Sequence, residues 1–180
     1  GSEMCIRDRG PRVIRFDHVS KTYPGGTRAV DDFSLTIEQG STTVFLGTSG
    51  CGKTTLMRMV NAMVTPTSGT VFVRGADVTG ADPVRLRRSI GYVLQEGGLF
   101  PHRSIADNIA TVPRLEGVNK AESRERALEL LTLVGLEREM ADRYPSQLSG
   151  GQRQRVGVAR ALANRADILL MAVSYTHLRA

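Results

Sequence analysis

Residues 47–54 combine glycines with a lysine and a threonine in a spacing suited to binding a chain of phosphates. The segment matches the phosphate-loop pattern G-x-x-x-x-G-K-[ST] and consists of Gly47, Thr48, Ser49, Gly50, Cys51, Gly52, Lys53 and Thr54, followed by Thr55. Glycine permits the tight curl that lets backbone N–H groups surround a polyphosphate. A helix beginning at Lys53 would direct its positive end at the anion. The pattern predicts ATP binding, with Lys53 neutralising β/γ charge and Thr54 ligating Mg²⁺. The alternative is a glycine-rich turn between a strand and a helix.

A second glycine-containing segment lies about a hundred residues further along the chain. It consists of Leu148, Ser149, Gly150, Gly151 and Gln152. Ser149 is a favourable helix N-cap, and the amides of the two glycines after it carry no bulky side chain. These features predict a second anion-binding cup at a helix N-terminus. The alternative is an ordinary capped helix start.

Together, the two segments resemble those of ABC ATPases, in which the first is the P-loop and the second is the signature sequence. The resemblance implies that Leu148–Gln152 faces ATP held by the P-loop of another subunit, so that a head-to-tail dimer encloses two ATP molecules. It implies that Gln95 is the glutamine that contacts Mg²⁺ and the attacking water, and that Tyr23 stacks on adenine. The alternatives are an exposed loop glutamine and a half-buried strand tyrosine. Val30 is expected either beside the adenine or in the core.

The same resemblance implies an Asp-Glu pair after the strand expected at Ile168–Met171, where this chain has Ala172 and Val173. His18 and His102 precede the signature segment, so neither is expected to be the family's later switch histidine, and His177 is assigned to a non-native terminus. We therefore expect this polypeptide to bind ATP weakly and to hydrolyse it negligibly.

Within the family, the chain resembles the ATPases of importers for glycine betaine, choline or carnitine. The resemblance lies in the segments Asp82–Val93, Gly98–His102, Asn108–Pro113 and Asp142–Pro145. It implies a homodimer with a second ATP-binding subunit, contact with transmembrane permease subunits, and indirect cooperation with an extracytoplasmic solute-binding protein. The implied location is cytoplasmic, peripheral on the inner face of the membrane. Alternatives are the ATPase of an amino-acid importer and a soluble ABC ATPase outside transport.

The pattern of apolar residues predicts the elements that position these segments. Strands are expected at residues 12–23 (an edge strand), 29–37, 41–46, 70–73, 89–94 and 168–171, and helices at 53–63, from 83, at 104–110, from 119 and at 149–164. Asp82, Asn119 and Ser149 are predicted N-caps, with Glu122 completing a capping box. This alternation predicts an α/β fold: a P-loop NTPase core of ABC type, with a mixed sheet, an antiparallel β-subdomain and a helical subdomain, incomplete at the C-terminus.

Composition excludes several other classes of protein. The formal net charge of +6 is spread along the chain without a basic run interleaved with aromatics, so we expect no nucleic-acid partner. The two cysteines do not suggest a disulfide framework. The apolar runs are too short to cross a bilayer, and the first residues do not resemble a signal peptide.

The two termini have a nucleotide-level relationship. One nucleotide sequence that encodes residues 1–9 has a reverse complement that encodes Val173–Ala180, and it resembles a transposon-end adapter of sequencing libraries. Residues 1–9 and 172–180 are therefore expected to be non-native, and residues 10–171 to form a partial ABC domain with a helical lobe at about 97–163. The alternative is ordinary flexible termini.

Overall fold

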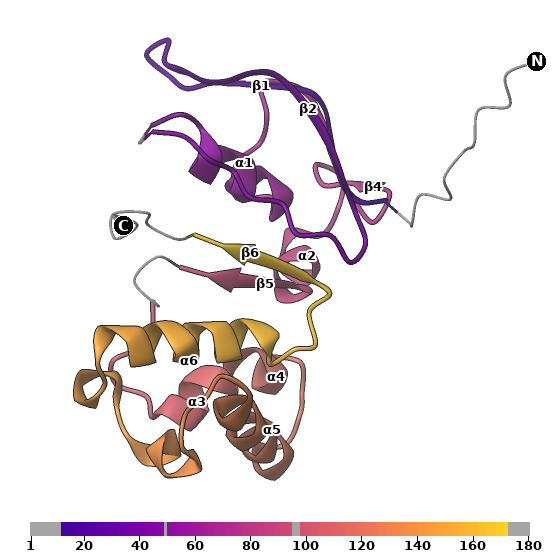
Figure 1. The fold of residues 1–180 in the computed structure, drawn as a ribbon. Coiled ribbons are helices and arrows are strands. Elements are labelled where there is room, and N and C mark those ends of the chain that lie inside the picture. Colours follow the sequence, from indigo (N-terminus) through magenta and orange to yellow (C-terminus); the bar gives the residue numbers. More distant parts are fainter. Residues whose placement is uncertain (1–11, 49, 95–97, 173–180) are drawn as a thin grey trace, which may run out of the picture. The chain divides into compact units, whose positions relative to one another are not determined.

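The computed structural model describes residues 12–48, 50–94 and 98–172 (Figure 1). These residues form two compact units, which divide between Arg87 and Arg88. The expected non-native residues 1–9 and 173–180 lie outside the described residues, whereas Ala172 is described and donates its N–H to the Val93 carbonyl at 3.0 Å.

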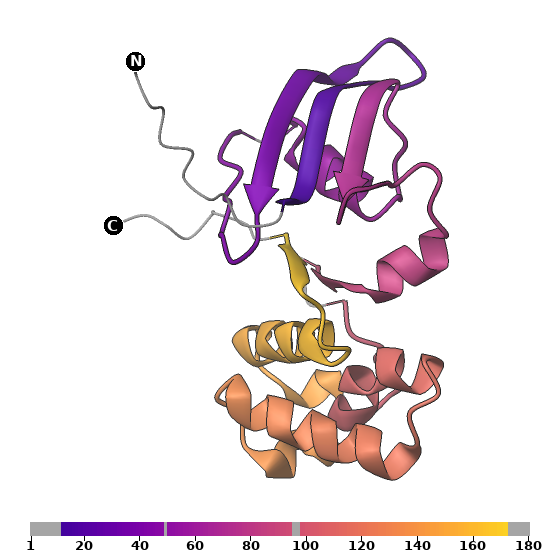
Figure 2. The ribbon, with the colours of Figure 1, turned by 90° about the vertical axis from the view of Figure 1, so that its right-hand side faces the viewer.

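The first unit is built on a four-stranded antiparallel sheet in the order β2-β1-β3-β4 (Figure 2). Its strands are β1 (Arg12–Thr22), β2 (Arg28–Glu38), β3 (Ser68–Val73) and β4 (Ala76–Asp77). Alternate residues of β1, such as Ile14 and Phe16, are buried on one face, as a half-buried strand requires. The prediction that residues 12–23 form an edge strand is wrong, because β1 pairs with β2 on one side and β3 on the other.

Helix α1 (Lys53–Val60) packs against β2 and β3 of this sheet. It buries Leu56, Met59 and Val60, which follow the helical i, i+3, i+4 spacing. The helix ends earlier than predicted, at Val60, and Arg87 donates to the carbonyls of Asn61 and Ala62 just beyond it, at 3.2 and 3.1 Å.

Helix α2 (Pro83–Arg88) begins as predicted. The Asp82 carboxylate accepts from the Val84 N–H at 2.9 Å, and Pro83 needs no hydrogen-bond acceptor at the first helical position.

Residues 41–48 form no strand, so the predicted strand at 41–46 is wrong. Val44 is 58% exposed and Leu46 is 75% exposed. A strand apolar along its length is stable only between hydrogen-bonded neighbours. Among the described residues, neither the four-stranded sheet nor the β5-β6 pair includes this segment.

The second unit pairs a short parallel sheet with a group of helices. Strands β5 (Ile90–Val93) and β6 (Ile168–Met171) run parallel. The helices are α3 (Ile105–Ile109), α4 (Thr111–Leu115), α5 (Lys120–Leu133) and α6 (Gly150–Leu162), with the 3₁₀ turns η1 (Arg138–Asp142) and η2 (Pro145–Gln147). Strand β6 alternates between buried and exposed residues, so it is less buried than its apolar sequence predicts.

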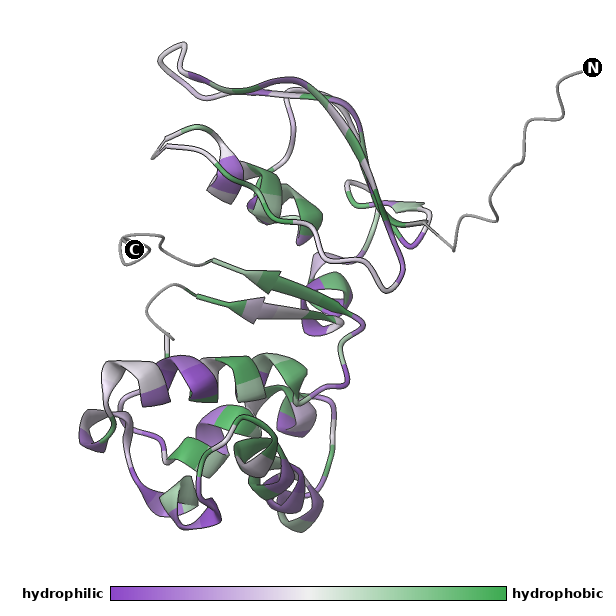
Figure 3. Ribbon diagram, viewed as in Figure 1, coloured by the Kyte–Doolittle hydropathy of each residue, from purple (hydrophilic) through white to green (hydrophobic). Residues whose placement is uncertain are grey.

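One apolar core holds these helices together. Figure 3 shows apolar residues on β6 and on the faces that the helices turn toward one another. The fully or nearly fully buried members include Ile105, Ile109, Ala127, Leu130, Leu131, Leu148 and Val156. Side chains of this type contribute roughly 1.5–3 kcal/mol each when fully buried.

Polar caps fix the ends of these helices as the sequence predicts. The Asn119 side chain accepts from the Glu122 N–H at 2.9 Å at the start of α5. In a capping box, the Glu122 carboxylate would also accept from the backbone N–H of Asn119. Here the carboxylate accepts instead from the Asn119 side-chain amide, at 3.3 Å. Gly135, with φ 71°, follows the helix end. In the described residues, no helix is long and apolar enough to cross a membrane.

Candidate functional site

The ammonium group of Lys53 lies within the loop that the sequence predicts to hold phosphates. Its Nζ atom donates to the carbonyl oxygens of Gly47 at 2.6 Å and Thr48 at 2.7 Å. Helix α1 begins at Lys53, so its first N–H groups face the same loop without helical acceptors. A fixed cation and the positive end of a helix therefore meet at this loop, as anion binding requires.

Gly52 is required where the loop enters α1. Its φ of +90° is strained for other residues, and an added Cβ would lie 2.3 Å from the carbonyl oxygen of Ala29 in β2. The loop thus rests against the backbone of β2. Val30, beside it, is 8% exposed, which favours the core-packing alternative for this residue.

Cys51 is exposed and lies beside the lysine. The Lys53 ammonium donates to Cys51 Sγ at 3.2 Å. This hydrogen bond lowers the pKa of the Cys51 thiol below its usual value, because it stabilises the thiolate. The charge that the loop provides for phosphate therefore also acts on a thiol.

Tyr23 follows β1 and reaches the first turns of α1. Its hydroxyl lies 3.4 Å from Thr55 Oγ1, and the ammonium of Lys21 lies 5.4 Å from its ring centroid. Tyr23 is half-buried, so part of its side chain remains exposed. The structure therefore brings Tyr23 and the phosphate loop together in the first unit.

Thr54 fits the role expected of a magnesium ligand. Its side chain is exposed in the first turn of α1. Among the described residues, no cluster of three or more His, Cys, Asp or Glu side chains could hold a metal ion. Mg²⁺ is commonly held by one or two protein oxygens together with substrate phosphates and water, so a single hydroxyl beside a phosphate loop suits it.

The second glycine segment forms the N-terminus of α6. Ser149 is the N-cap, and its Oγ accepts from the Gln152 N–H at 3.2 Å. The Gln152 side chain in turn accepts from the Ser149 N–H at 2.8 Å, which completes a capping box. Leu148 is buried in the helical core, so its side chain anchors the segment and does not face outward.

Gly150 and Gly151 have no packing reason to be glycine. An added Cβ at Gly151 would meet no atom within 4 Å, and one at Gly150 would approach only Arg153 Nη2, at 3.9 Å. Glycine destabilises a helix relative to alanine by about 0.5–1 kcal/mol. Both glycines are exposed, so their backbone is open to approach by another molecule.

Two predicted site residues lie outside the described residues, namely Ser49 and Gln95. His18 lies on the sheet, where Nδ1 is 2.7 Å from Asp32 Oδ1, and His102 packs its ring against Phe100. Among the residues that the structure describes, neither histidine hydrogen-bonds to the phosphate loop or the signature segment.

Sequence reasoning missed Asn108, a fully buried polar residue of α3. Its side chain accepts from the Phe100 N–H at 2.7 Å and donates to the carbonyls of Phe100, Arg103 and Ser104 at 3.0–3.1 Å. It therefore fixes the turn that precedes α3. The only signal in the sequence is an asparagine between apolar residues of a predicted helix.

Sequence reasoning also missed Arg160, near the C-terminus of α6. Its Nη1 donates to the Gly98 carbonyl at 2.7 Å. In sequence it resembles one more exposed arginine of a basic helix.

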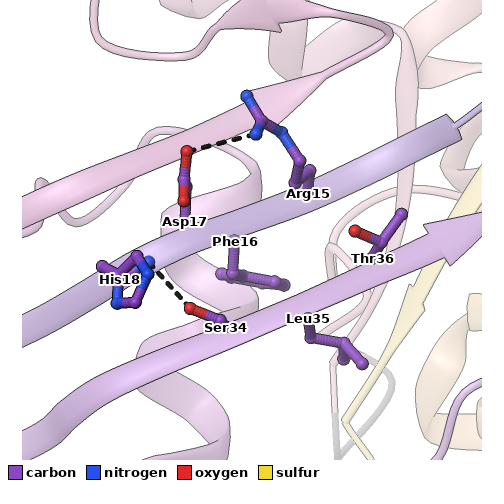
Figure 4. Close-up of a pocket in the computed structure, with 7 residues that line it drawn as sticks. All are labelled: Arg15, Phe16, Asp17, His18, Ser34, Leu35 and Thr36. Atoms are coloured by element: carbon purple, nitrogen blue, oxygen red, sulfur yellow. Dashed lines mark hydrogen bonds and ion pairs between the residues drawn. The ribbon is translucent and has the colours of Figure 1, made fainter.

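A shallow depression of about 380 Å³ lies over β1 and β2 (Figure 4). Its lining includes Arg15, paired with Asp17 at 3.1 Å, and Ser34, which accepts from the His18 N–H at 2.9 Å. None of the predicted nucleotide-binding residues lines it.

Comparison with known proteins gives consistent results. Residues 30–171 match the profile of the family described as "ABC transporter". The carnitine transport ATP-binding protein OpuCA of Listeria monocytogenes is 51% identical over 159 residues, covering 88% of this chain and 40% of the relative. The choline transport ATP-binding protein OpuBA of Bacillus subtilis is 49% identical over 159 residues, covering 88% and 42%. The methionine import ATP-binding protein MetN of Bifidobacterium longum is 47% identical over 167 residues, covering 88% and 41%.

This chain thus spans about two fifths of the length of these curated relatives. Among solved structures, the ATP-binding cassette MJ0796, determined as a dimer in a post-hydrolysis state bound to ADP and Pi, superimposes with a TM-score of 0.79. It is 34% identical, and the match covers 90% of this chain and 76% of that one. The match confirms the predicted α/β fold of ABC type.

Proposed function

We propose, from the premise that this chain belongs to the ABC transporter family of ATP-binding proteins, that it is part of a subunit that binds and hydrolyses ATP to power an importer of quaternary-amine osmoprotectants. Glycine betaine, choline and carnitine are the solutes that this proposal includes. The names of relatives at 49–51% identity support this solute class. The ATP-binding protein of a methionine importer is 47% identical, which is almost as similar, so the solute needs a direct test.

The observation that carries the ATPase proposal is the pair of glycine-containing helix N-termini. The loop before α1 includes Gly52, which the fold requires to be glycine, and the Lys53 ammonium lies within this loop. The start of α6 uses glycines that the fold does not require. The first arrangement suits a site that holds phosphate within the chain, and the second suits a surface that receives phosphate from another chain.

Each residue has a separate task in this proposal. Lys53 and the N–H groups of α1 hold the β- and γ-phosphates, and Tyr23 stacks on adenine. When bound, Mg²⁺ neutralises developing charge on the phosphates, with Thr54 and Gln95 as the protein groups that hold it. Ser149 and the amides of Gly150 and Gly151 contact the ATP held by a second copy of the subunit.

The residues after β6 bear on the rate of hydrolysis. The family's Asp-Glu pair would follow this strand, and Ala172 and Val173 stand there instead. Without a carboxylate to polarise the attacking water, we expect turnover by this polypeptide to fall far below the ~10 s⁻¹ typical of enzymes. A turnover near 1 s⁻¹ that Lys53→Ala abolishes would contradict this expectation.

The proposed assembly follows from the same family. We propose residues 10–171 as one ATP-binding domain with a helical lobe at about 97–163. Its partners are a second identical subunit and transmembrane permease subunits on the inner face of the membrane, with a solute-binding protein acting indirectly. The dimeric state of a related cassette supports the first of these.

The ATPase proposal is tested by equilibrium binding of a fluorescent ATP analogue to this chain. Lys53→Ala should weaken binding by at least about tenfold, because it removes the loop's cation from beside the phosphates. Lys120→Ala is the matched control, because it removes an exposed lysine at the start of α5, outside the phosphate loop and the signature segment, and it should leave binding unchanged. Equal binding by wild type and Lys53→Ala would refute the assigned site.

The solute is tested with the full-length subunit and its permease in vesicles. Uptake of radiolabelled glycine betaine, choline, carnitine and methionine is measured with ATP inside. We expect uptake of the quaternary amines, and uptake of methionine alone would refute the solute assignment while leaving the ATPase assignment intact.

A further inference from the structure

Lys21 lies near the end of β1, two residues before Tyr23, and its ammonium group has two contacts. Its Nζ atom donates to the backbone carbonyl of Thr65 at 2.6 Å. The same atom lies over the Tyr23 ring, 5.4 Å from the ring centroid. Side chains two positions apart in an extended chain project from the same face, which explains how this lysine reaches that ring. One ammonium group therefore joins the ring proposed to stack on adenine to a backbone carbonyl beyond α1.

The carbonyl that holds Lys21 has a fixed position relative to β1. The backbone N–H of Thr67 donates to the Ser20 carbonyl at 2.8 Å. The Thr67 hydroxyl accepts from the Thr22 N–H at 3.0 Å and donates to the Thr22 carbonyl at 3.3 Å. These hydrogen bonds attach the segment after α1 to the residues on both sides of Lys21. The lysine is therefore anchored to backbone that is itself attached to the lysine's own strand.

Tyr23 is held at two further points. Its N–H donates to the Thr27 carbonyl at 2.9 Å, within the turn between β1 and β2. Its hydroxyl lies 3.4 Å from the Oγ1 atom of Thr55, a residue of α1 that is 9% exposed. The backbone and the hydroxyl fix the two ends of the side chain, but the ring can still rotate about the axis that joins them, because this torsion has broad minima. A cation over the ring face opposes that rotation.

The surroundings of this contact determine how much it can contribute. An ammonium is attracted to an aromatic face by the negative charge density of that face, and the attraction is stronger where water is excluded. Lys21 and Tyr23 are both half-buried, so water competes with the contact only in part. A side chain that is already immobilised loses less conformational freedom when a ligand binds to it. The contact therefore lowers the entropic cost of stacking a base on this ring.

We infer that Lys21 is a positioning residue of the proposed nucleotide site: its ammonium, anchored on the Thr65 carbonyl, fixes the plane of the Tyr23 ring for stacking on adenine. This inference rests on the proposed ATPase function. Lys21 acts at the base end of the nucleotide and Lys53 at the phosphate end, so the two lysines contribute to affinity in different ways. Removing Lys21 should weaken the binding of a ligand that carries a base and leave the binding of a bare triphosphate unchanged.

Arg15 provides a matched control in the same sheet. Its guanidinium lies over the Phe72 ring, 4.2 Å from the ring centroid, and the two residues are paired between β1 and β3. This contact also places a cation over an aromatic ring, but neither residue belongs to the proposed nucleotide site. Arg15→Met and Lys21→Met therefore remove the same charge and the same kind of contact, at one ring that is proposed to bind adenine and at one that is not.

The test measures equilibrium binding of ATP and of inorganic tripolyphosphate, each with Mg²⁺, to the full-length subunit by calorimetry. We expect Lys21→Met to weaken ATP binding about fivefold, as the loss of one cation–π contact predicts, with tripolyphosphate affinity changed less than about twofold. Lys21→Arg should bring ATP affinity to within about twofold of wild type, because a guanidinium can also donate to a carbonyl and lie over a ring. Arg15→Met should leave both affinities within about twofold of wild type.

A spectroscopic measurement on the wild type separates ring positioning from a general effect of charge. When lysines are labelled with carbon-13 at Cε, the resonance that is missing from Lys21→Arg belongs to Lys21. The Tyr23 ring should shift the attached protons upfield, and Tyr23→Leu should abolish the shift. ATP should change this resonance more than tripolyphosphate does, since only ATP brings a base to the ring. This measurement decides the question if Lys21→Met does not fold.

The inference is overturned if Lys21→Met weakens ATP and tripolyphosphate binding equally, or weakens neither. It is also overturned if Lys21→Arg fails to recover ATP affinity, if Arg15→Met has an equal effect, or if the Lys21 resonance does not respond to Tyr23→Leu. A wild type that binds neither ATP nor tripolyphosphate would instead defeat the proposed function itself.

Discussion

Replacing Gly151 with alanine should separate the stability of the fold from its function. At this position an added methyl group meets no atom of the chain within 4 Å. The residue lies in the first turn of α6, where alanine is the better helix former. We therefore expect Gly151→Ala to be neutral or to stabilise the chain by up to about 0.5 kcal/mol. That gain corresponds to a rise in Tm of roughly 1–2 °C for a chain of this size.

The functional effect should have the opposite sign. In the proposed dimer, the Gly151 amide contacts phosphate held by the partner subunit, and the added methyl group would occupy the space that the phosphate needs. A hydrogen bond to a charged group contributes about 1.5–3 kcal/mol. Its loss predicts a roughly 10- to 150-fold fall in the ATPase rate of the full-length dimer.

The assay pairs thermal unfolding of this chain with ATPase measurements on the full-length dimer. Gly52→Ala is the contrasting variant, because its Cβ would lie 2.3 Å from the Ala29 carbonyl oxygen at a φ of +90°. It should destabilise the chain by at least about 2 kcal/mol. A fall of several degrees in the Tm of Gly151→Ala, or an unchanged ATPase rate, would refute the reasoning.

Three further predictions concern other residues. Iodoacetamide should alkylate Cys51 faster in wild type than in Lys53→Met, because the Lys53 ammonium lowers the pKa of the thiol. Mg-ATP should slow the reaction of the wild type. Equal alkylation rates for wild type and Lys53→Met would contradict the assigned contact. Asn108→Ala should lower the Tm by roughly 10 °C, since it leaves several backbone groups without partners at about 1–3 kcal/mol each. The Asp32 hydrogen bond raises the pKa of His18 above 6.5, so its small contribution to stability should be complete below pH 6.5 and should disappear as pH rises through the folded-state pKa. An NMR titration in which Asp32→Asn leaves the His18 midpoint unchanged would contradict this last prediction.

Local signals in the sequence predicted the starts of several helices well. Asp82, Asn119 and Ser149 each cap the helix that the sequence assigned to them, because a cap depends only on residues within one turn. The phosphate loop and the signature segment were found for the same reason. Each is a short run of residues whose types and spacing are visible in the sequence without knowledge of the fold.

Features that depend on distant residues were harder to predict. The apolar run at residues 41–46 has the composition of a buried strand, yet no strand of the described residues pairs with it. The position of β1 inside its sheet depends on β3, which lies beyond α1 in the chain. The hydrogen bond of Arg160 depends on a carbonyl 62 residues away, which no pattern of neighbouring residues indicates.

The close approach of Gly52 to the Ala29 carbonyl also limits how this protein can be engineered. The proposed phosphate-binding segment and the hairpin of β1 and β2 form one structural module, since the shape of the segment depends on backbone from the hairpin. If residues 47–54 were grafted into another scaffold, that scaffold would need a strand whose backbone carbonyl lies in the position that the Ala29 carbonyl has relative to Gly52 here. Directed evolution of nucleotide preference should therefore recombine residues 12–60 as one block.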